Sequence, residues 1–179
     1  VWAVFIKTIE DLYEYLKSIG IQSRILYGAT PVASDGMSEE DESFELTREG
    51  IIKEFHRDDS SFNVIIANPF AVAESISLHK VCHNAIYIER SFNCAHFVQS
   101  KDRIHRYGLK PDVVTKYYYL LSEGSIDETI DSRLHIKENR MISITEASDI
   151  PLFDNLKDDG DADIQAIISD YVKRRNHKI

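Results

Sequence analysis

The 179-residue sequence has only two cysteines, Cys82 and Cys94, so it lacks the disulfide framework that is typical of small secreted domains. It also lacks any apolar run of the roughly 20 residues that a membrane-spanning helix needs, and its first residues lack the basic lead of a signal peptide. We therefore expect a cytoplasmic protein without a membrane segment. The chain opens directly on an apolar stretch, which favours a domain of a longer protein.

Positive charge is also scarce, because 21 Lys and Arg residues stand against 30 Asp and Glu residues, a formal net charge of −9. This balance argues against a protein that coats nucleic acid non-specifically through a basic surface. Much of the acid lies in two short stretches, 38–42 and 158–161, and the rest of the chain is closer to neutral. A local basic groove therefore remains compatible with the composition.

Two elements of a nucleotide site are missing from the sequence. It has no Gly-x-x-x-x-Gly-Lys-Ser/Thr loop, whose backbone amides would hold the phosphates of a nucleotide. It also has no acidic motif at a strand end that would hold magnesium. We expect a chain without these elements to hydrolyse no nucleotide by itself.

Potential zinc ligands gather between residues 79 and 96, but their spacing is poor for a metal site. Cys82 and His83 are adjacent, and His79, Cys94 and His96 complete no paired finger spacing. We predict no metal site here. Buried cysteines and hydrogen-bonded histidines are the ordinary alternative.

The sequence contains an alternation of apolar strands and amphipathic helices. We expect strands over residues 1–6, 23–27, 62–67, 85–88 and 113–121. Helices are expected over residues 8–19, 47–57, 93–108 and 125–141, with Thr8 and Ser125 as caps and residues 28–43 as a surface loop. This order predicts an α/β fold over residues 1–142, in which a mostly parallel sheet carries helices on both faces.

After residue 142 the pattern weakens. Residues 143–160 are polar and acidic, and a last helix is expected over residues 163–175. We treat residues 143–179 as a carboxyl-terminal extension. Ligands of parallel sheets gather at the carboxyl ends of the strands, which points to residues 68–77 and 89–93 and to the helix that follows them.

That helix carries two arginines, Arg103 and Arg106, three residues apart. On a helix this spacing puts both guanidiniums on one face, and two permanently charged, forked donors suit a phosphate. The alternative is a solvated helix face on which Asp102 pairs with Arg106, which is the commoner arrangement when these residues are taken alone.

The wider pattern Gln99-x-x-Asp102-Arg103-x-His105-Arg106-x-Gly108 resembles motif VI of the Swi/Snf-type branch of superfamily-two helicases. Four upstream stretches resemble further pieces of the same family in the same order: residues 1–8 (motif IV), 26–30, 48–55 and 65–78 (motif V). The resemblance covers about residues 1–140. It implies the second RecA-like lobe of such a helicase, a three-layer α/β sandwich.

The sequence departs from the family pattern at three places. Ala73, Ser75 and Ser77 stand where motif V usually carries glycines and an asparagine, and Leu109 replaces the glutamine that follows motif VI. The acidic loop between residues 31 and 44 is longer than usual. We interpret these differences as marks of a divergent, bacterial subgroup.

The resemblance also implies the roles of individual residues. ATP with Mg²⁺ would bind between this lobe and a first lobe that is absent from this chain, with Arg103 and Arg106 as arginine fingers. Further residues would face the nucleotide or the phosphates of a DNA strand; these are Gln99, Asp102, Ser75 and Ser77 for the nucleotide, and Gly28, Thr30 and Asn68 for DNA, with RNA left open. The alternative is a degenerate RecA-like module that serves as a protein-docking domain.

Overall fold

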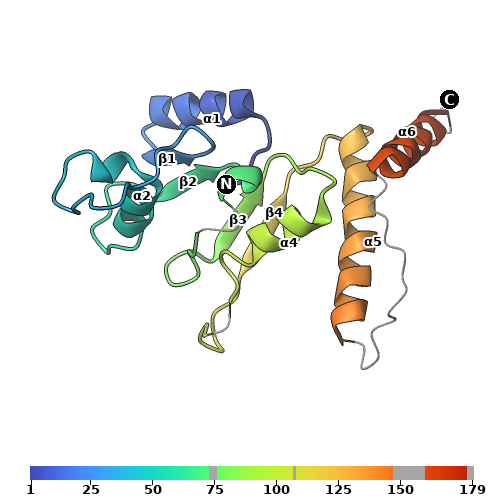
Figure 1. Cartoon of the computed structure of the whole chain (residues 1–179). Helices are drawn as coiled ribbons and strands as arrows, with labels where there is room; N and C mark the ends of the chain where they lie inside the picture. Colours follow the sequence, from blue (N-terminus) through green and yellow to red (C-terminus); the bar gives the residue numbers. More distant parts are fainter. Residues whose placement is uncertain (73–75, 107, 147–159, 177–179) are drawn as a thin grey trace. The chain divides into compact units, whose positions relative to one another are not determined.

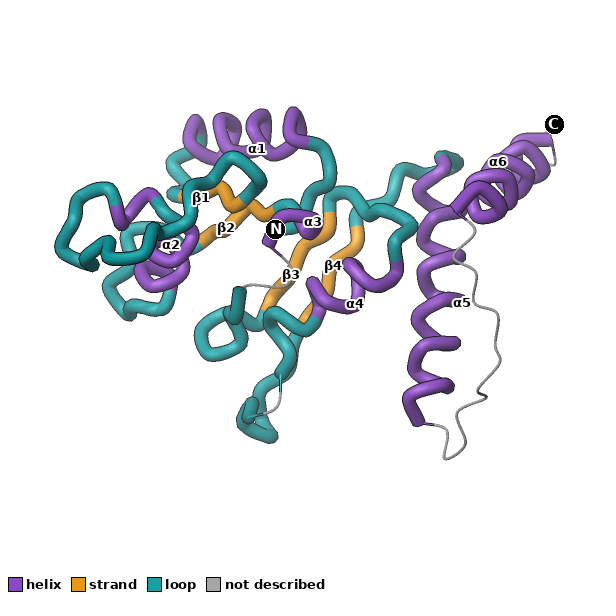
Figure 2. The backbone as a smooth tube through the Cα atoms, viewed as in Figure 1, coloured by secondary structure: helices purple, strands orange, loops and turns teal. Residues whose placement is uncertain are grey.

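The computed structural model describes residues 1–72, 76–106, 108–146 and 160–176. The chain divides into two compact units, which we describe separately. Unit 1 comprises Val1–Glu89 and Ala95–Leu120, and unit 2 comprises Arg90–Cys94 and Leu121–Ile179. Figures 1 and 2 label the helices and strands along the chain.

Unit 1 is built on short parallel strands. β1 (Ser23–Leu26) pairs with β2 (Val64–Ala67), and β3 (Asn84–Tyr87) pairs with β4 (Lys116–Tyr119), both pairs in parallel. Trp2 lies between the two pairs and forms a parallel bridge to Ala67 on one side and to Tyr87 on the other. The predicted parallel α/β arrangement is therefore confirmed (Figure 2).

The expected strand over residues 1–6 is wrong, because only Trp2 bridges to neighbouring strands and α1 (Ile6–Ser18) begins at the sixth residue. Phe5 and Ile6 are 65% and 53% exposed, although their apolar character suggested burial. The Glu89 carboxylate accepts hydrogen bonds from the backbone N–H groups of Val4 (3.0 Å) and Phe5 (2.9 Å). The chain thus turns out of the sheet and into a helix after one bridging residue.

The expected cap of α1 is also wrong. Thr8 was expected to cap the helix, but the cap position is Phe5, which forms no side-chain cap bond. The Thr8 hydroxyl instead donates to Glu89 Oε1 at 2.6 Å, and Asp11 pairs with Lys7 at 2.6 Å. Glu89, two residues after β3, therefore accepts the hydrogen bonds from donors at the start of α1. Local residues were expected to accept them.

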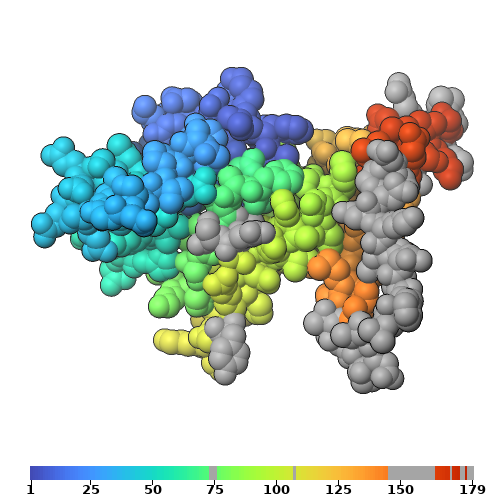
Figure 3. All heavy atoms as spheres, viewed as in Figure 1, coloured from blue at the N-terminus to red at the C-terminus, as the bar shows by residue number. Residues whose placement is uncertain are grey.

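One face of the β1–β2 pair in unit 1 is covered by α1. Ile9 of the helix is buried with Ala3 and Ile66, and the partly buried Leu12 and Leu16 pack against them. Figure 3 shows the outer side of α1, in dark blue, on the surface of this unit. The helix was predicted from this apolar stripe, and its described bounds agree to within two residues.

The opposite face is covered by α4 (Cys94–Lys101) and α2 (Arg48–Phe55). Phe97 of α4 packs edge-on against Tyr87, with ring centroids 5.4 Å apart, and Phe55 of α2 stacks on Phe62 at 5.8 Å. Side chains alternate between the faces of a strand, so Tyr87 points away from the α1 side on which Ile86 lies. Unit 1 therefore has helices on both faces, as predicted.

Three further elements of unit 1 are short. These are η1 (Phe44–Leu46), a single 3₁₀ turn before α2, α3 (Pro69–Val72), which follows β2, and β4, which covers only part of the expected strand over residues 113–121. Residues 28–43 contain no helix or strand, in agreement with the predicted loop.

In unit 2, α5 (Ile126–Glu146) continues past its expected end at residue 141, and α6 (Gly160–Asn176) is the last helix. Ser125 caps α5, since its Oγ accepts from the N–H of Asp127 at 3.1 Å. The nearly buried Arg90 forms an ion pair with Asp131 of α5. No helix in the described part of the chain is long and apolar enough to cross a membrane.

Candidate functional site

The predicted site residues of unit 1 fall into two groups. Gly28, Thr30 and Asn68 follow the carboxyl ends of β1 and β2, as expected. The residues after α4 lie near the starts of β3 and β4, since Leu78 N–H donates to Arg103 O at 2.8 Å and His105 Nδ1 lies 3.3 Å from Thr115 Oγ1. The sequence placed both groups at one edge, and that part of the prediction is wrong.

The first group centres on a β-turn, Tyr27–Thr30, which we call the Gly28 turn. The N–H of Thr30 donates to Tyr27 O at 3.1 Å, and the buried Thr30 hydroxyl accepts from Tyr27 N–H and donates to Ile25 O. Gly28 is exposed, and a Cβ atom at this position would meet nothing within 4 Å. Thr30 therefore shapes the turn from inside, while Gly28 leaves open space outside it.

Asn68 is also turned inward. Its Nδ2 donates to Val4 O at 2.7 Å, and its Oδ1 accepts from Phe70 N–H at 2.9 Å. Its backbone N–H donates to Leu26 O. The side chain thus connects the beginning of α3 to the segment that leads into α1.

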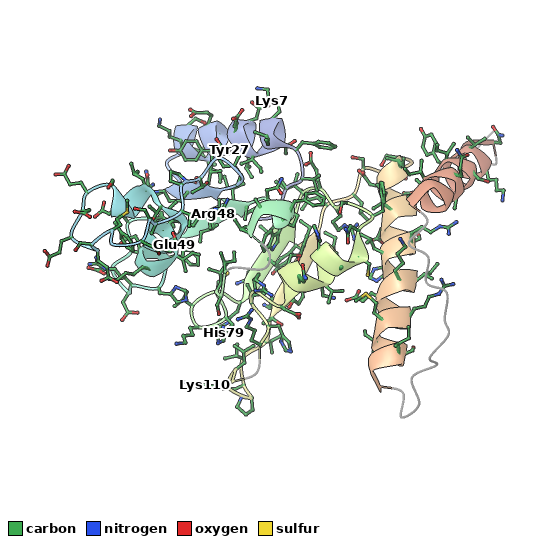
Figure 4. All side chains as sticks on the ribbon, viewed as in Figure 1. Lys7, Tyr27, Arg48, Glu49, His79 and Lys110 are labelled. Atoms are coloured by element: carbon green, nitrogen blue, oxygen red, sulfur yellow. The ribbon has the colours of Figure 1, made fainter. Side chains whose placement is uncertain are left out.

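Arg48 holds the same edge, although its sequence context identified it only as part of a helix resembling the family. Its guanidinium donates to three backbone carbonyls, Tyr27 O (3.2 Å), Thr30 O (3.3 Å) and Ala71 O (3.1 Å). Figure 4 shows Arg48 and Tyr27 in one part of the unit and His79 in another. The helix dipole disfavours a cation at the first residue of a helix. An arginine at that position was therefore a signal that its side chain has specific hydrogen-bond acceptors elsewhere.

The two arginines of the second group differ in environment. α4 ends at Lys101, so Arg103 and Arg106 lie in the turns after the helix and do not share one helix face. Arg103 is only 6% exposed, and it donates from Nε to Gln99 O (2.8 Å) and from Nη1 to Ile76 O (3.0 Å). The prediction of two guanidiniums on one face is wrong because the helix ends too early.

Arg106 is exposed, and its Nε donates to the backbone oxygen of Asp102 at 3.2 Å. Within the described residues no ion pair joins Arg106 to the Asp102 carboxylate, so the alternative of a solvated i,i+4 pair does not describe this region. The charged end of Arg106 is therefore available to an external anion.

Ser77 and His79 lie within reach of the same charge. Ser77 Oγ and His79 Nδ1 are 2.9 Å apart. Burial lowers the pKa of His79 below its ordinary value of 6.5, and the positive charge of Arg106 lowers it further. The pKa of His79 therefore responds to the positive charge of Arg106.

Gln99 contributes a buried side-chain oxygen, Oε1, that has no hydrogen-bond partner among the described residues. Buried polar atoms are normally paired, so this oxygen is a candidate for a ligand or a water. Asp102, three residues later in the sequence, is exposed. The predicted Ser75 lies outside the described residues.

No group of three or more metal-binding side chains occurs in the ranges that the structure describes. Of the candidate zinc ligands, Cys94 is buried and Cys82 Sγ donates to Asn84 O at 3.3 Å. The described residues therefore offer cationic and amide groups for phosphates, and no cluster for a metal ion.

No family model and no curated protein matches the sequence. The chain is similar to a solved structure described as the C-terminal part of the Fun30 ATPase domain, with a TM-score of 0.58 and 22% identity. The match covers 74% of this chain and 38% of that chain, so this chain spans less than half of the neighbour's length. At this identity the likeness concerns the fold alone, and it agrees with the parallel α/β fold of this chain.

Proposed function

We propose that this chain is the second motor lobe of an ATP-dependent translocase or helicase that acts on nucleic acid, with DNA as its track. The observation that carries the proposal is an exposed arginine, Arg106, at the motif VI position of a lobe with this fold. Arg106 is fully charged at neutral pH and forms no ion pair among the described residues. It is available to a phosphate that another lobe holds.

Two described side chains can donate hydrogen bonds to the phosphates of ATP. Arg106 supplies positive charge and the Ser77 hydroxyl supplies a donor, whereas the unpaired Gln99 Oε1 accepts hydrogen bonds and suits a water or another donor beside the phosphates. By resemblance to the helicase family, Mg²⁺ and the rest of the nucleotide would be held by the first lobe. When bound, ATP with Mg²⁺ supplies the phosphoryl group whose hydrolysis drives the motor.

Arg106 would stabilise the negative charge that spreads over the transferred phosphoryl oxygens in the transition state. An arginine finger of this kind contributes on the order of 10³ to 10⁵ in rate. Arg103 would have to give up its bonds to Ile76 O and Gln99 O to reach the same phosphate. We therefore assign the direct contact to Arg106, and Arg103 supports the surrounding turns from inside.

The Gly28 turn would bind the phosphate backbone of the track. Neither Gly28 nor Ala29 donates its N–H to another described residue, and both residues are exposed. Backbone N–H groups bind phosphate oxygens without reading the base sequence. Thr30 and Asn68 support this contact from inside, through the bonds to Ile25 O and Val4 O.

The alternative is a RecA-like docking module without a role in hydrolysis. It is favoured by an apolar face of the β3–β4 pair on which Ile86, Tyr118 and Leu120 are all exposed. A partner protein could cover this face. Hydrolysis measurements separate the two functions.

The test is DNA-stimulated ATP hydrolysis by the full-length protein that carries both lobes, compared with its Arg106→Ala variant. We expect turnover to fall by about 10³-fold or more. Arg57→Ala is the matched control, because Arg57 is an exposed arginine engaged with Glu54 and Asp59 on α2 and the loop after it. Unchanged turnover in Arg106→Ala would overturn the motor function and favour the docking module.

A further inference from the structure

Arg48 joins two segments that follow different strands. It holds Tyr27 O and Thr30 O in the turn after β1, and Ala71 O in α3 after β2. Its own backbone N–H donates to Pro31 O at 2.9 Å. One guanidinium therefore sets the position of the Gly28 turn relative to α3.

The Arg48 contact at Tyr27 also orients the next amide. A peptide group is planar and trans, so the C=O of Tyr27 and the N–H of Gly28 point in opposite directions. Because Tyr27 O faces the Arg48 guanidinium at 3.2 Å, the Gly28 N–H faces away from it. Gly28 is exposed and its N–H donates to no described residue, so the turn presents an unpaired donor.

The type of side chain at position 48 matters for this geometry. Arginine has a planar fork of five N–H donors, and here its three nitrogens each donate to a different carbonyl. A lysine keeps the charge but carries its three N–H donors on a single nitrogen at the end of a flexible chain. It is therefore unable to hold all three carbonyls at once.

We propose that Arg48 is a positioning residue for nucleic acid, which aims the Gly28 amide at a backbone phosphate without touching the phosphate itself. The proposal rests on the proposed function only in that the ligand is a nucleic-acid strand. It adds a residue that makes no contact with the strand and yet determines how tightly the strand binds. Arg48→Lys separates this geometry from charge.

The experiment is equilibrium binding of a fluorescent DNA duplex and of a single strand to the full-length protein, without nucleotide, over a series of salt concentrations. Arg48→Lys is expected to weaken binding roughly tenfold, as expected for losing a hydrogen bond to a charged phosphate. In Arg48→Ala, which removes the charge, the slope of log affinity against log salt is expected to stay unchanged, because Arg48 neutralises no phosphate. Arg57→Lys, the matched control, is expected to bind like the unmodified protein.

A double-mutant cycle with Gly28→Ala tests whether Arg48 acts through the turn. If it does, the double variant binds no more weakly than the weaker single variant, since both changes remove the same contact. Thermal unfolding of each variant confirms that the protein is folded.

Three results would overturn the proposal: full affinity in Arg48→Lys, additive losses in the cycle, or a salt slope reduced by about one in Arg48→Ala, which would indicate direct contact of Arg48 with a phosphate. A protein that binds no nucleic acid at all would overturn the positioning role together with the proposed track. A protein that binds DNA, shows the expected loss of affinity in Arg48→Lys and yet hydrolyses no ATP would overturn the motor function alone. Binding and hydrolysis thus fail in distinguishable ways.

Discussion

The Gly28 turn and the turns after α4 hold their functional groups in opposite ways. In the Gly28 turn the side chain of Thr30 points inward, and Arg48 of α2 holds the turn from inside. The backbone at Gly28 is the exposed part. After α4, Arg103 is held inward and the side chain of Arg106 is exposed. A neutral backbone suits a contact with any phosphate of a strand, whereas an exposed cation suits the more concentrated charge of a triphosphate.

A shared design connects the two regions, because each is shaped by a guanidinium that donates to main-chain carbonyls. Arg48 donates to three of them and Arg103 to two. Charged donors form stronger hydrogen bonds than neutral ones, and their loss leaves carbonyls unpaired. We expect the inward arginines to stabilise the fold of the turns, and the exposed groups to contact the ligand.

Arg103→Ala gives the largest expected effect on stability. The change removes donors from Ile76 O and Gln99 O and leaves a space in a buried site, so the free energy of unfolding should fall by about 3 kcal/mol. Arg106→Ala should change it by less than about 0.5 kcal/mol, because Arg106 is exposed. Urea unfolding of both variants measures the difference, and equal losses would contradict the contrast between the two arginines.

Glu89→Ala is expected to come next. Three donors at the start of α1, the N–H groups of Val4 and Phe5 and the Thr8 hydroxyl, lose their acceptor. The free energy of unfolding should fall by about 2 kcal/mol, and amide hydrogen exchange should rise in the first turn of α1. Glu10→Ala, on the same helix and exposed, is the control. Unchanged exchange at the start of α1 would contradict a capping role for Glu89.

Gly28→Ala should separate stability from binding. A Cβ atom has open space at this position, so the free energy of unfolding should change by less than about 0.5 kcal/mol. The added methyl group would obstruct a phosphate that approaches the backbone, and DNA affinity should fall roughly tenfold. Melting temperature and DNA binding measure the two effects. Normal DNA binding by the variant would show that Gly28 does not contact the DNA.

The smallest expected effect concerns His79. Its pKa is lowered in the folded protein, so the unfolded chain binds more protons as the pH falls through the ordinary value of 6.5. Stability from this group is therefore present above pH 6.5 and is lost as the pH falls towards the folded-state pKa. In Arg106→Gln the pKa should move part of the way back towards 6.5, because burial, the larger cause, remains. NMR titration measures the pKa of His79 in the unmodified protein and in Arg106→Gln. The same pKa in both proteins would show that the charge of Arg106 does not act on His79.

Much of the fold could be predicted because it depends on local pattern. The α1 helix followed from the spacing of Ile9, Leu12 and Leu16, and the Thr47 cap position agrees with the predicted start of α2. Strand positions were recovered to within a few residues except at residues 1–6. There the apolar composition was correct for Trp2 and Ala3, which are buried, but it carried no information on where the chain leaves the sheet.

The site could be predicted only in part. Motif order pointed to the Gly28 turn and to Arg103 and Arg106, and the structure brings Ser77 and Arg103 into one region through Leu78. The inward orientation of Thr30 and Asn68 was not predictable, since their acceptors, Ile25 O and Val4 O, are backbone atoms that carry no sequence signal. Arg48 was missed for the same reason.

By itself the sequence determined the order of strands and helices, the parallel α/β class and the candidates for phosphate contact, because each depends on residue type and short-range spacing. Only the tertiary structure decided which of those candidates face outward. Glu89 caps a helix that begins 83 residues earlier in the chain, at Ile6, and Arg48 holds a turn about 20 residues away, because these contacts depend on packing between distant segments. Arg103 and Arg106 are three residues apart in one sequence motif, but α4 ends at Lys101, before both of them. Arg103 is therefore a buried support, whereas Arg106 is an exposed charge.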